Sequence, residues 1–334
     1  MKKFIYILFL LFLGCQSALD TITENDSQYN TINNENNNTV NNNTNTNINV
    51  NNNTNSTGIL TYKNIKLLDV NFKKNSNLIS DSQNLTYSNS VRNMFESVVE
   101  KVNSRIGINE TQYINFELSI EDMSAANGGG VNGGNLGLTD LQYGYVGNTI
   151  SSIKTTIYID MQDVVDNFKH IYGDTSIQDI LNHEMAHAMF LVSNIKRKIA
   201  SQYFNNYPTW LHEGMAVYTE NGFDAYLKEA KYSGNITVKG IVNLTQDDYS
   251  AYFEGAATFE YIKTKYSEQK IKDFVNYLIN NDTNVATAII NVFGITLTTL
   301  SNRVKIFCTN AISNYRGSIR SSEKNDVKLL KRLL

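Results

Sequence analysis

The sequence has little cysteine, proline, histidine or net positive charge. Two cysteines in 334 residues exclude a scaffold held by many disulfides, and a single proline excludes Pro-rich linkers and collagen-like repeats. Lys and Arg number 29 against 32 Asp and Glu, which excludes a strongly basic nucleic-acid-binding protein, so no nucleic-acid partner is expected. Three of only four histidines lie between positions 183 and 212, which directs the search for function to that segment.

The N-terminus has the pattern of a secretion signal. Two lysines precede an unbroken apolar run, Phe4 to Leu13, whose ten residues would rise only about 15 Å as a helix and cannot span a bilayer. The run ends in FLGC, which resembles the lipobox of bacterial lipoproteins. The resemblance implies a signal peptide over 1–14, lipidation of Cys15, and a domain anchored to the membrane of the bacterial cell envelope, outside the cytoplasm. The alternative is a plain signal peptide with an incidental cysteine.

Residues 15–58 are rich in asparagine and threonine. Between Asn33 and Asn55, 15 of 23 residues are asparagine, so almost no apolar surface is available to offset the entropy cost of ordering. We therefore expect a disordered tether that holds a folded domain away from the membrane surface.

The remaining sequence has strand patterns first and helix patterns afterwards. Alternation of apolar and polar residues predicts three strands, over 59–70, 113–120 and 153–160. Apolar residues at helical spacing predict a helix over 90–102, and the Gly-rich stretch 127–137 is expected to be an irregular loop.

This order of elements predicts an α+β fold. We expect one domain over 59–320, with a sheet-containing part over 59–173, a mainly helical part over 174–320, and a basic tail over 321–334. No apolar run elsewhere in the sequence reaches 18 residues, so no membrane-spanning segment is expected there either. A monomer is favoured.

The sequence HEMAH at 183–187 is predicted to lie on a helix. A capping box is available at Thr175 and Gln178, or in a second register at Ser176 and Asp179. Apolar residues at helical spacing and good helix formers follow, which indicates that the helix continues through the motif.

On such a helix, His183 and His187 share one face. They lie about 6 Å apart along the axis and about 40° apart around it, so both imidazoles can bind one tetrahedral zinc ion. Glu184 lies at the edge of the same face, from which its carboxylate can reach a metal-bound water. The alternative is two histidines hydrogen-bonded to carbonyls on a buried helix.

A second helix is predicted to begin near Pro208, because proline is tolerated in the first turn, where its missing N–H would have no partner. The sequence WLHEGMAVY follows at 210–218. A catalytic zinc ion needs a third protein ligand and one open position, and Glu213 is the candidate. His212 is the alternative, and since neighbouring side chains point about 100° apart on a helix, only one should face the metal.

HEMAH followed by WLHEGMAVY resembles the gluzincin metallopeptidases, the peptidase-MA-like group, over about residues 176–275. In that group a W-L-x-E-G-x-A helix supplies the third ligand. The resemblance implies one Zn²⁺ bound by His183, His187 and Glu213, with Glu184 as general base. It also implies a thermolysin-like catalytic domain, with a mixed sheet that has an edge strand.

Two differences from the aminopeptidase branch of that group favour an endopeptidase. Twenty-five residues separate His187 from Glu213, which is longer than in that branch, and the Gly-rich stretch has no acidic residue to anchor a free amine. We therefore expect a zinc metalloendopeptidase with a peptide or protein as substrate. The resemblance implies that an edge strand near 153–160 pairs with an extended substrate.

Further site residues are implied downstream. Tyr252 and Gly255 fit a Y-x-x-G segment that packs near the site in the resembled group, where a tyrosine can donate to the oxyanion. The alternative is a packing role, since the chain has 20 tyrosines, and Tyr249 is a second candidate. Ligand histidines usually donate their other ring N–H to an acceptor, for which three residues are candidates: Glu220, Asp179 and Glu254.

The alternative function is a non-catalytic zinc-binding or adhesive surface lipoprotein with the same fold. A broken ligand set would favour it, whereas here the set is intact. A metal-scavenging lipoprotein would be expected to have His-rich tracts, and only four histidines are present.

Overall fold

The computed structural model describes ten stretches of the chain: 58–74, 79–123, 136–146, 149–161, 164–165, 169–170, 176–198, 207–232, 236–245 and 248–315. Several expectations lie outside the described residues. These are the signal peptide, lipidation at Cys15, almost all of the tether, most of the Gly-rich stretch and the basic tail.

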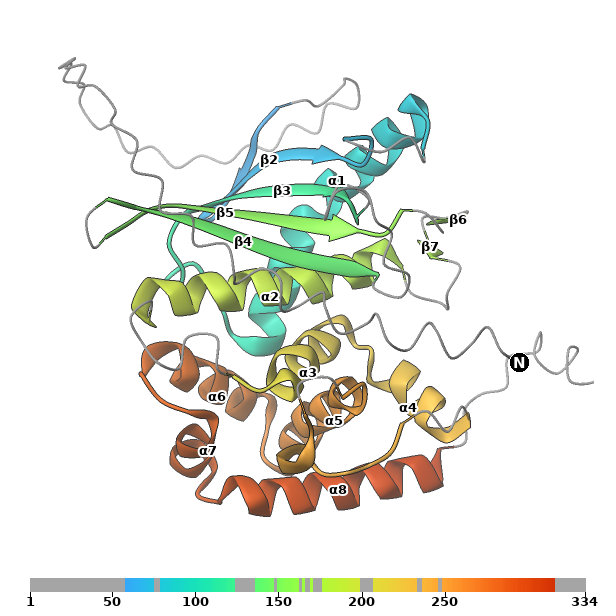
Figure 1. Ribbon diagram of the computed structural model, residues 1–334, viewed down its shortest axis with the longest axis vertical. Helices are drawn as coiled ribbons and strands as arrows, with labels where there is room; N and C mark the ends of the chain where they lie inside the picture. Colours follow the sequence, from blue (N-terminus) through green and yellow to red (C-terminus); the bar gives the residue numbers. More distant parts are fainter. Residues whose placement is uncertain are drawn as a thin grey trace, which may run out of the picture.

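Five strands form a mixed sheet in the order β1-β2-β3-β5-β4 (Figure 1). Their bounds are Leu60–Tyr62 for β1, Ile65–Asn71 for β2, Phe116–Asp122 for β3, Gly137–Val146 for β4 and Thr149–Ile159 for β5. The three central strands are parallel, and β1 and β4 run antiparallel to them at the two edges. Two short strands, β6 (Val164–Val165) and β7 (Lys169–His170), pair with each other.

Two of the strand predictions need correction. The segment 59–70 is a hairpin, because Lys63 adopts a left-handed φ of 51° and the chain reverses between Tyr62 and Ile65. The strand near 153–160 is β5, which lies inside the sheet between β3 and β4 and is therefore not an edge. The edge strand next to β5 is β4, which the sequence did not reveal because its Gly-rich approach and its buried polar residue, Thr139, hide the alternation.

The helix predicted over 90–102 is longer, and forms α1 from Asp81 to Ile106. Ser80 caps its first turn in a capping box with Gln83, and Gly107 ends it in a left-handed conformation. The first turns are polar, so their helical character depends on the cap and was not visible in the apolar pattern. The helix connects two parallel strands, β2 and β3, as parallel pairing requires.

The C-terminal part is helical, which confirms the α+β prediction. Its helices are α2 (Ile177–Lys198), α3 (Thr209–Glu220), α4 (Phe223–Tyr232), α5 (Ser250–Lys265), α6 (Glu268–Asn280), α7 (Val285–Phe293) and α8 (Leu297–Asn314), with a 3-10 turn, η4, at Ile241–Asn243. In Figure 1, α2 lies between the sheet and the helices α3 and α5. Buried apolar side chains from the sheet and from the helices form one continuous core.

Within the described residues, no single helix is both long enough and apolar enough to cross a membrane. Only α7 and α8 taken together meet that test of length and composition, and they are bent by 80° at the break between them.

Candidate metal centre

The helix that carries HEMAH, α2, is capped by Ser176 and Asp179, which is one of the two predicted capping boxes. The Asp179 main-chain N–H donates to Ser176 Oγ at 3.2 Å, and Asp179 Oδ2 accepts from the Ser176 N–H at 3.0 Å. This reciprocal pairing satisfies amide groups that the first helical turn leaves without partners. The cap therefore fixes where α2 starts, and so places the motif in the middle of a continuous helix.

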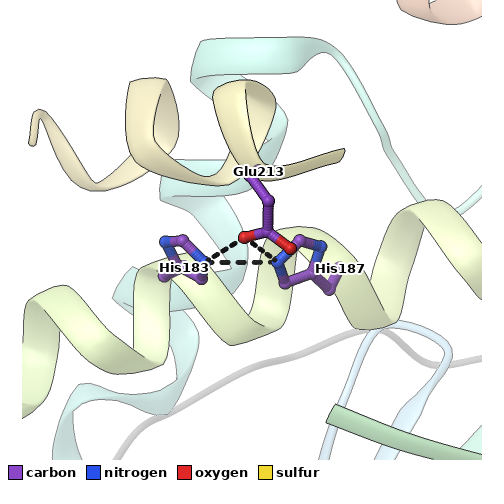
Figure 2. A group of neighbouring side chains, drawn as sticks. All are labelled: His183, His187 and Glu213. Atoms are coloured by element: carbon purple, nitrogen blue, oxygen red, sulfur yellow. Dashed lines mark hydrogen bonds and ion pairs between the residues drawn. The ribbon is translucent and has the colours of Figure 1, made fainter. Parts of the chain in front are cut away.

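Three side chains from two helices converge at one point, as Figure 2 shows. The two ring nitrogens, Nε2 of His183 and Nε2 of His187, are 3.2 Å apart. Glu213 Oε2 lies 3.3 Å from the first and 3.5 Å from the second. The group lies at the interface of α2 with α3, and the structure confirms that these residues could hold a metal ion.

The spacing of these atoms fits a zinc ion. Ligands at about 2.05 Å from a tetrahedral ion stand about 3.3 Å from one another, which agrees with the three observed separations. Two imidazoles and one carboxylate are a donor set that zinc accepts in catalytic sites, with the fourth position left for water or substrate. The residues present therefore fit one zinc ion.

The electrostatics of the cluster also favour a cation. Burial alone would raise the pKa of Glu213, but the charges and hydrogen bonds of His187 and His183 hold that pKa well below its usual range. Burial alone would lower the pKa of His183, but Glu220 and Glu213 raise it well above its usual value. The two carboxylates, Glu220 and Glu213, thus favour a proton on the imidazole of His183 between them. A divalent metal ion would displace that proton on binding.

Glu220 is placed as an outer partner of the candidate metal site would be. Its Oε2 lies 3.2 Å from His183 Nδ1, so the carboxylate can hold the ring with Nε2 toward the other two ligands. Glu220 comes seven residues after Glu213, two turns further along the same face of α3. The two other candidates are ruled out for this role: Asp179 caps α2, and Glu254 accepts two main-chain N–H groups elsewhere.

His212 is not part of the ligand group. Its ring packs against the rings of Phe190 and Tyr207, with centroids 5.5 Å and 6.0 Å away. Burial and the charge on His187 lower the pKa of His212 to about 4. Of the two neighbouring candidates, the structure therefore brings Glu213 to the site and leaves the histidine in an aromatic pocket beside it.

Glu184 lies beside the cluster, buried against the edge strand β4. Its Oε2 accepts a hydrogen bond of 2.7 Å from Thr139 Oγ1. This contact joins residues 45 positions apart, and the sequence analysis did not find it because no strand is predicted over the residues of β4.

Comparisons with known proteins leave the family open. No protein-family model matches the chain, and no curated protein matches it significantly. One similar solved structure is a mutant of a two-domain M1 zinc metallopeptidase bound to L-arginine, with a TM-score of 0.37 and 13% identity. The alignment covers 74% of this chain and 48% of that one, so this chain spans about half the length of the other. At that TM-score we infer neither fold nor activity from the likeness.

Tyr252 belongs to a group of three tyrosines on α4, on α5 and at the N-cap of α5. Its ring stacks on Tyr226, with centroids 5.9 Å apart and planes 13° apart, and it also contacts Tyr249. Tyr249 donates its hydroxyl to Glu229 at 2.8 Å. Burial, and then nearby negative charges that include Glu220 and Glu213, raise the pKa of Tyr226 well above its usual value. The sequence did not single out Tyr226, and the oxyanion role of Tyr252 stays a prediction.

Two glycines let α3 and α5 approach closely beside the candidate ligand Glu213. A Cβ at Gly214 would overlap main-chain atoms of Gly255, and a Cβ at Gly255 would overlap the carbonyl oxygen of Trp210. The two backbones therefore touch where other residues would hold them apart. Because Gly214 follows Glu213 directly, this contact lies next to the candidate ligand.

Proposed function

We propose that this chain is a zinc-dependent peptidase that cleaves internal peptide bonds. The observation that carries the proposal is the convergence of His183 and His187, from one helix, with Glu213, from another, at separations that suit one zinc ion. HExxH on a helix is the motif in which two histidines bind zinc and the glutamate acts as general base of a metalloprotease. Glu184 occupies that position here.

The residues of the chain supply the proton transfers. A bound zinc ion lowers the pKa of a water molecule and polarises the scissile carbonyl. Glu184 accepts the proton of the attacking water on its carboxylate, and then passes the same proton to the leaving nitrogen. Glu220 holds His183 in the orientation that the metal needs. Tyr252 is proposed to donate its phenolic proton toward the oxyanion.

The free edge of β4 is proposed to bind the substrate. In the described sheet, β4 pairs with β5 on one side and with no strand on the other, and it runs past Glu184. An extended peptide that added to this edge would gain main-chain hydrogen bonds with little dependence on its sequence. This replaces the expectation that the strand near 153–160 would serve as the edge.

The direction of Asp140 supports an endopeptidase. Thr139 faces Glu184, and because successive side chains of a strand alternate, Asp140 faces away from it. Its Oδ2 accepts a hydrogen bond of 3.1 Å from Gln142 on the same face. The acidic residue of β4 is therefore not directed at the site, where it would anchor the free amine of a peptide.

The FLGC sequence supports a further part of the proposal, that the domain is tethered to a membrane by lipid on Cys15. The test is expression with a labelled fatty acid. The native chain is expected to take up the label and to fractionate with membranes, whereas Cys15→Ser is expected to do neither. Label on the serine variant would refute lipidation at this position.

The decisive test of the enzyme combines metal analysis with hydrolysis of casein, with and without a chelator. We expect one zinc ion per chain and hydrolysis that stops on chelation and returns with zinc. Glu184→Gln should keep the zinc ion and lose roughly 10²–10⁴-fold in kcat. Wild-type rates from that variant would refute the assigned role. Zinc without hydrolysis of any of several proteins would favour the non-catalytic zinc-binding or adhesive surface protein instead.

A further inference from the structure

We propose that Thr139, on the edge strand β4, is a positioning residue that orients the carboxylate of Glu184 for proton transfer. This inference rests on the proposed peptidase function and deepens it, because it names a residue outside the HExxH and ligand helices on which the reaction depends. The carrying observation is a hydrogen bond between a buried hydroxyl and a buried carboxylate that come from different elements.

The hydroxyl of Thr139 has two acceptors within reach. Its Oγ1 lies 2.7 Å from Glu184 Oε2 and 3.0 Å from the main-chain oxygen of the same residue. A hydroxyl has one proton to donate, and a hydrogen bond to an ionised carboxylate is shorter and stronger than one to a neutral carbonyl. The proton therefore goes to Oε2 while Glu184 is ionised.

This arrangement gives the two carboxylate oxygens different tasks. Oε2 is held by the threonine hydroxyl, so Oε1 is the oxygen on which the proton from water is taken up and later released. No proton is gained or lost by Thr139 in either step, because its hydroxyl keeps its own proton throughout. The threonine therefore acts only through Glu184 and does not itself need to touch the substrate.

Gly137 and Thr139 together form the surface of β4 on which the Glu184 carboxylate packs, called its seat below. Gly137 lies two residues before Thr139, so both positions are on the same face of β4. A Cβ at Gly137 would lie 2.5 Å from Glu184 Oε1, 2.8 Å from Cγ and 2.9 Å from Cδ. Thus β4 fixes the plane of the carboxyl group in two ways. Thr139 donates a hydrogen bond to it, and Gly137 has no Cβ that would overlap it.

Such a seat matters because a general base must lie within hydrogen-bonding distance of the proton that it removes. An error of about 1 Å in the position of a catalytic group can reduce the rate by roughly 100-fold. Glu184 has three side-chain torsions, and burial alone does not select the orientation of its carboxyl group. The bond from β4 does so, and it also joins the proposed substrate-binding edge to the base.

Thr155 provides a matched control for the loss of a buried threonine hydroxyl. It lies on the neighbouring strand β5 and is 1% exposed, and its Oγ1 has no hydrogen-bond partner in the described part of the chain. Thr155→Val therefore makes the same chemical change in the same sheet without touching Glu184.

The kinetic experiment compares Thr139→Val, Thr139→Ser and Thr155→Val with the wild type, each loaded with one zinc ion. We expect Thr139→Val to lose roughly 10–100-fold in kcat, with KM and zinc content unchanged. Thr139→Ser should recover most of the lost rate, since it restores the donor, and Thr155→Val should match the wild type. A Thr139→Val enzyme within about twofold of the wild-type kcat would overturn the proposal, as would a serine variant no better than valine.

A second measurement does not depend on activity. In crystal structures of the zinc-loaded proteins, the carboxyl group of Glu184 is expected to turn from its wild-type position in Thr139→Val but not in Thr155→Val. An unchanged carboxyl group in Thr139→Val would overturn the proposal. If the wild type hydrolyses no peptide at all, the proposed function fails, and these structures still decide whether Thr139 orients the carboxylate.

Discussion

Two neighbouring helices carry the same dipeptide and use it in opposite ways. Glu213–Gly214 on α3 and Glu254–Gly255 on α5 meet where the two glycines touch, and both glutamates are buried, with 2% and 0% of their surface exposed. Glu213 faces two imidazoles of α2. Glu254 instead accepts main-chain N–H groups of the segment that precedes η4, at 2.7 Å from Lys239 N and 2.7 Å from Gly240 N.

The pKa values of the two carboxyl groups move in opposite directions. Burial raises the pKa of Glu254, and the two main-chain N–H groups offset only part of that effect. Burial acts in the same sense on Glu213, but the charges of His187 and His183 outweigh it and hold the pKa well below its usual range. Burial alone therefore does not decide whether a glutamate is suited to bind a metal ion. The neighbouring groups decide the direction of the pKa shift, because imidazoles bring cationic charge and amides bring only dipoles.

The largest expected effect is the loss of the metal from Glu213→Gln. An amide is a poor zinc ligand, so we expect zinc affinity to fall by more than about 100-fold and hydrolysis to be lost with it. Glu254→Gln is the control within the pair and should keep one zinc ion per chain. Metal analysis after dialysis measures both, and equal zinc loss from the two variants would break the comparison.

A smaller effect is expected from Glu220, which contacts His183 but is not one of the three candidate ligands. Glu220→Gln keeps the size of the side chain but removes the charge that faces His183 Nδ1. We expect zinc affinity to fall by roughly 10–100-fold, as is usual for outer partners, with the fold unchanged. Competition against a chromogenic chelator gives the affinity. A wild-type value would show that the contact does not tune the site.

The contact between the two helices is expected to matter for stability. Gly255→Ala introduces a Cβ that overlaps the Trp210 carbonyl oxygen, so the helices must separate at a cost of about 1–3 kcal/mol. At about 2–4 °C per kcal/mol, thermal unfolding should reveal the change. Gly58→Ala is the control, because nothing lies within 4 Å of a Cβ there. Equal melting temperatures for the two variants would contradict the close approach.

The smallest effect is a dependence of stability on pH through Glu254. Because its folded pKa is raised above the ordinary value of 4.5, the folded state favours the protonated form. The stability that this group contributes is complete below pH 4.5 and is lost as the pH rises through the raised pKa. Denaturant unfolding should therefore show that the free energy of unfolding of the wild type falls, relative to that of Glu254→Gln, as the pH rises through that window. A constant difference would contradict a raised pKa.

Much of the candidate site could be predicted from local patterns. The pairing of His183 with His187 follows from the helical period alone, and the start of α3 at Thr209 follows from Pro208. The sequence also placed Glu184 next to the first ligand. These predictions held because each depends on residues within one or two turns of the same helix, where the geometry of the backbone is fixed.

The long-range parts of the site could not be predicted in this way. The Thr139 hydroxyl joins Glu184 across 45 residues, and the sequence pattern predicts no strand at the residues of β4 that carry it. Three acidic residues were equal candidates for the outer partner, and only packing showed that Glu220 holds that position. The sheet order likewise put β4, and not β5, at the edge. Each of these depends on which elements pack together, which a local period does not specify.

The sequence by itself determined the chemistry: two imidazoles and a carboxylic acid on one face of a helix, a second helix with an acidic residue, and an α+β order of elements. The tertiary structure decided which of these side chains meet. It turned Glu213 rather than His212 toward the imidazoles, and it seated Glu184 against an edge strand. The physical reason is that helix geometry is set by hydrogen bonds four residues apart, whereas the partner of a buried charge is set by the packing of distant segments.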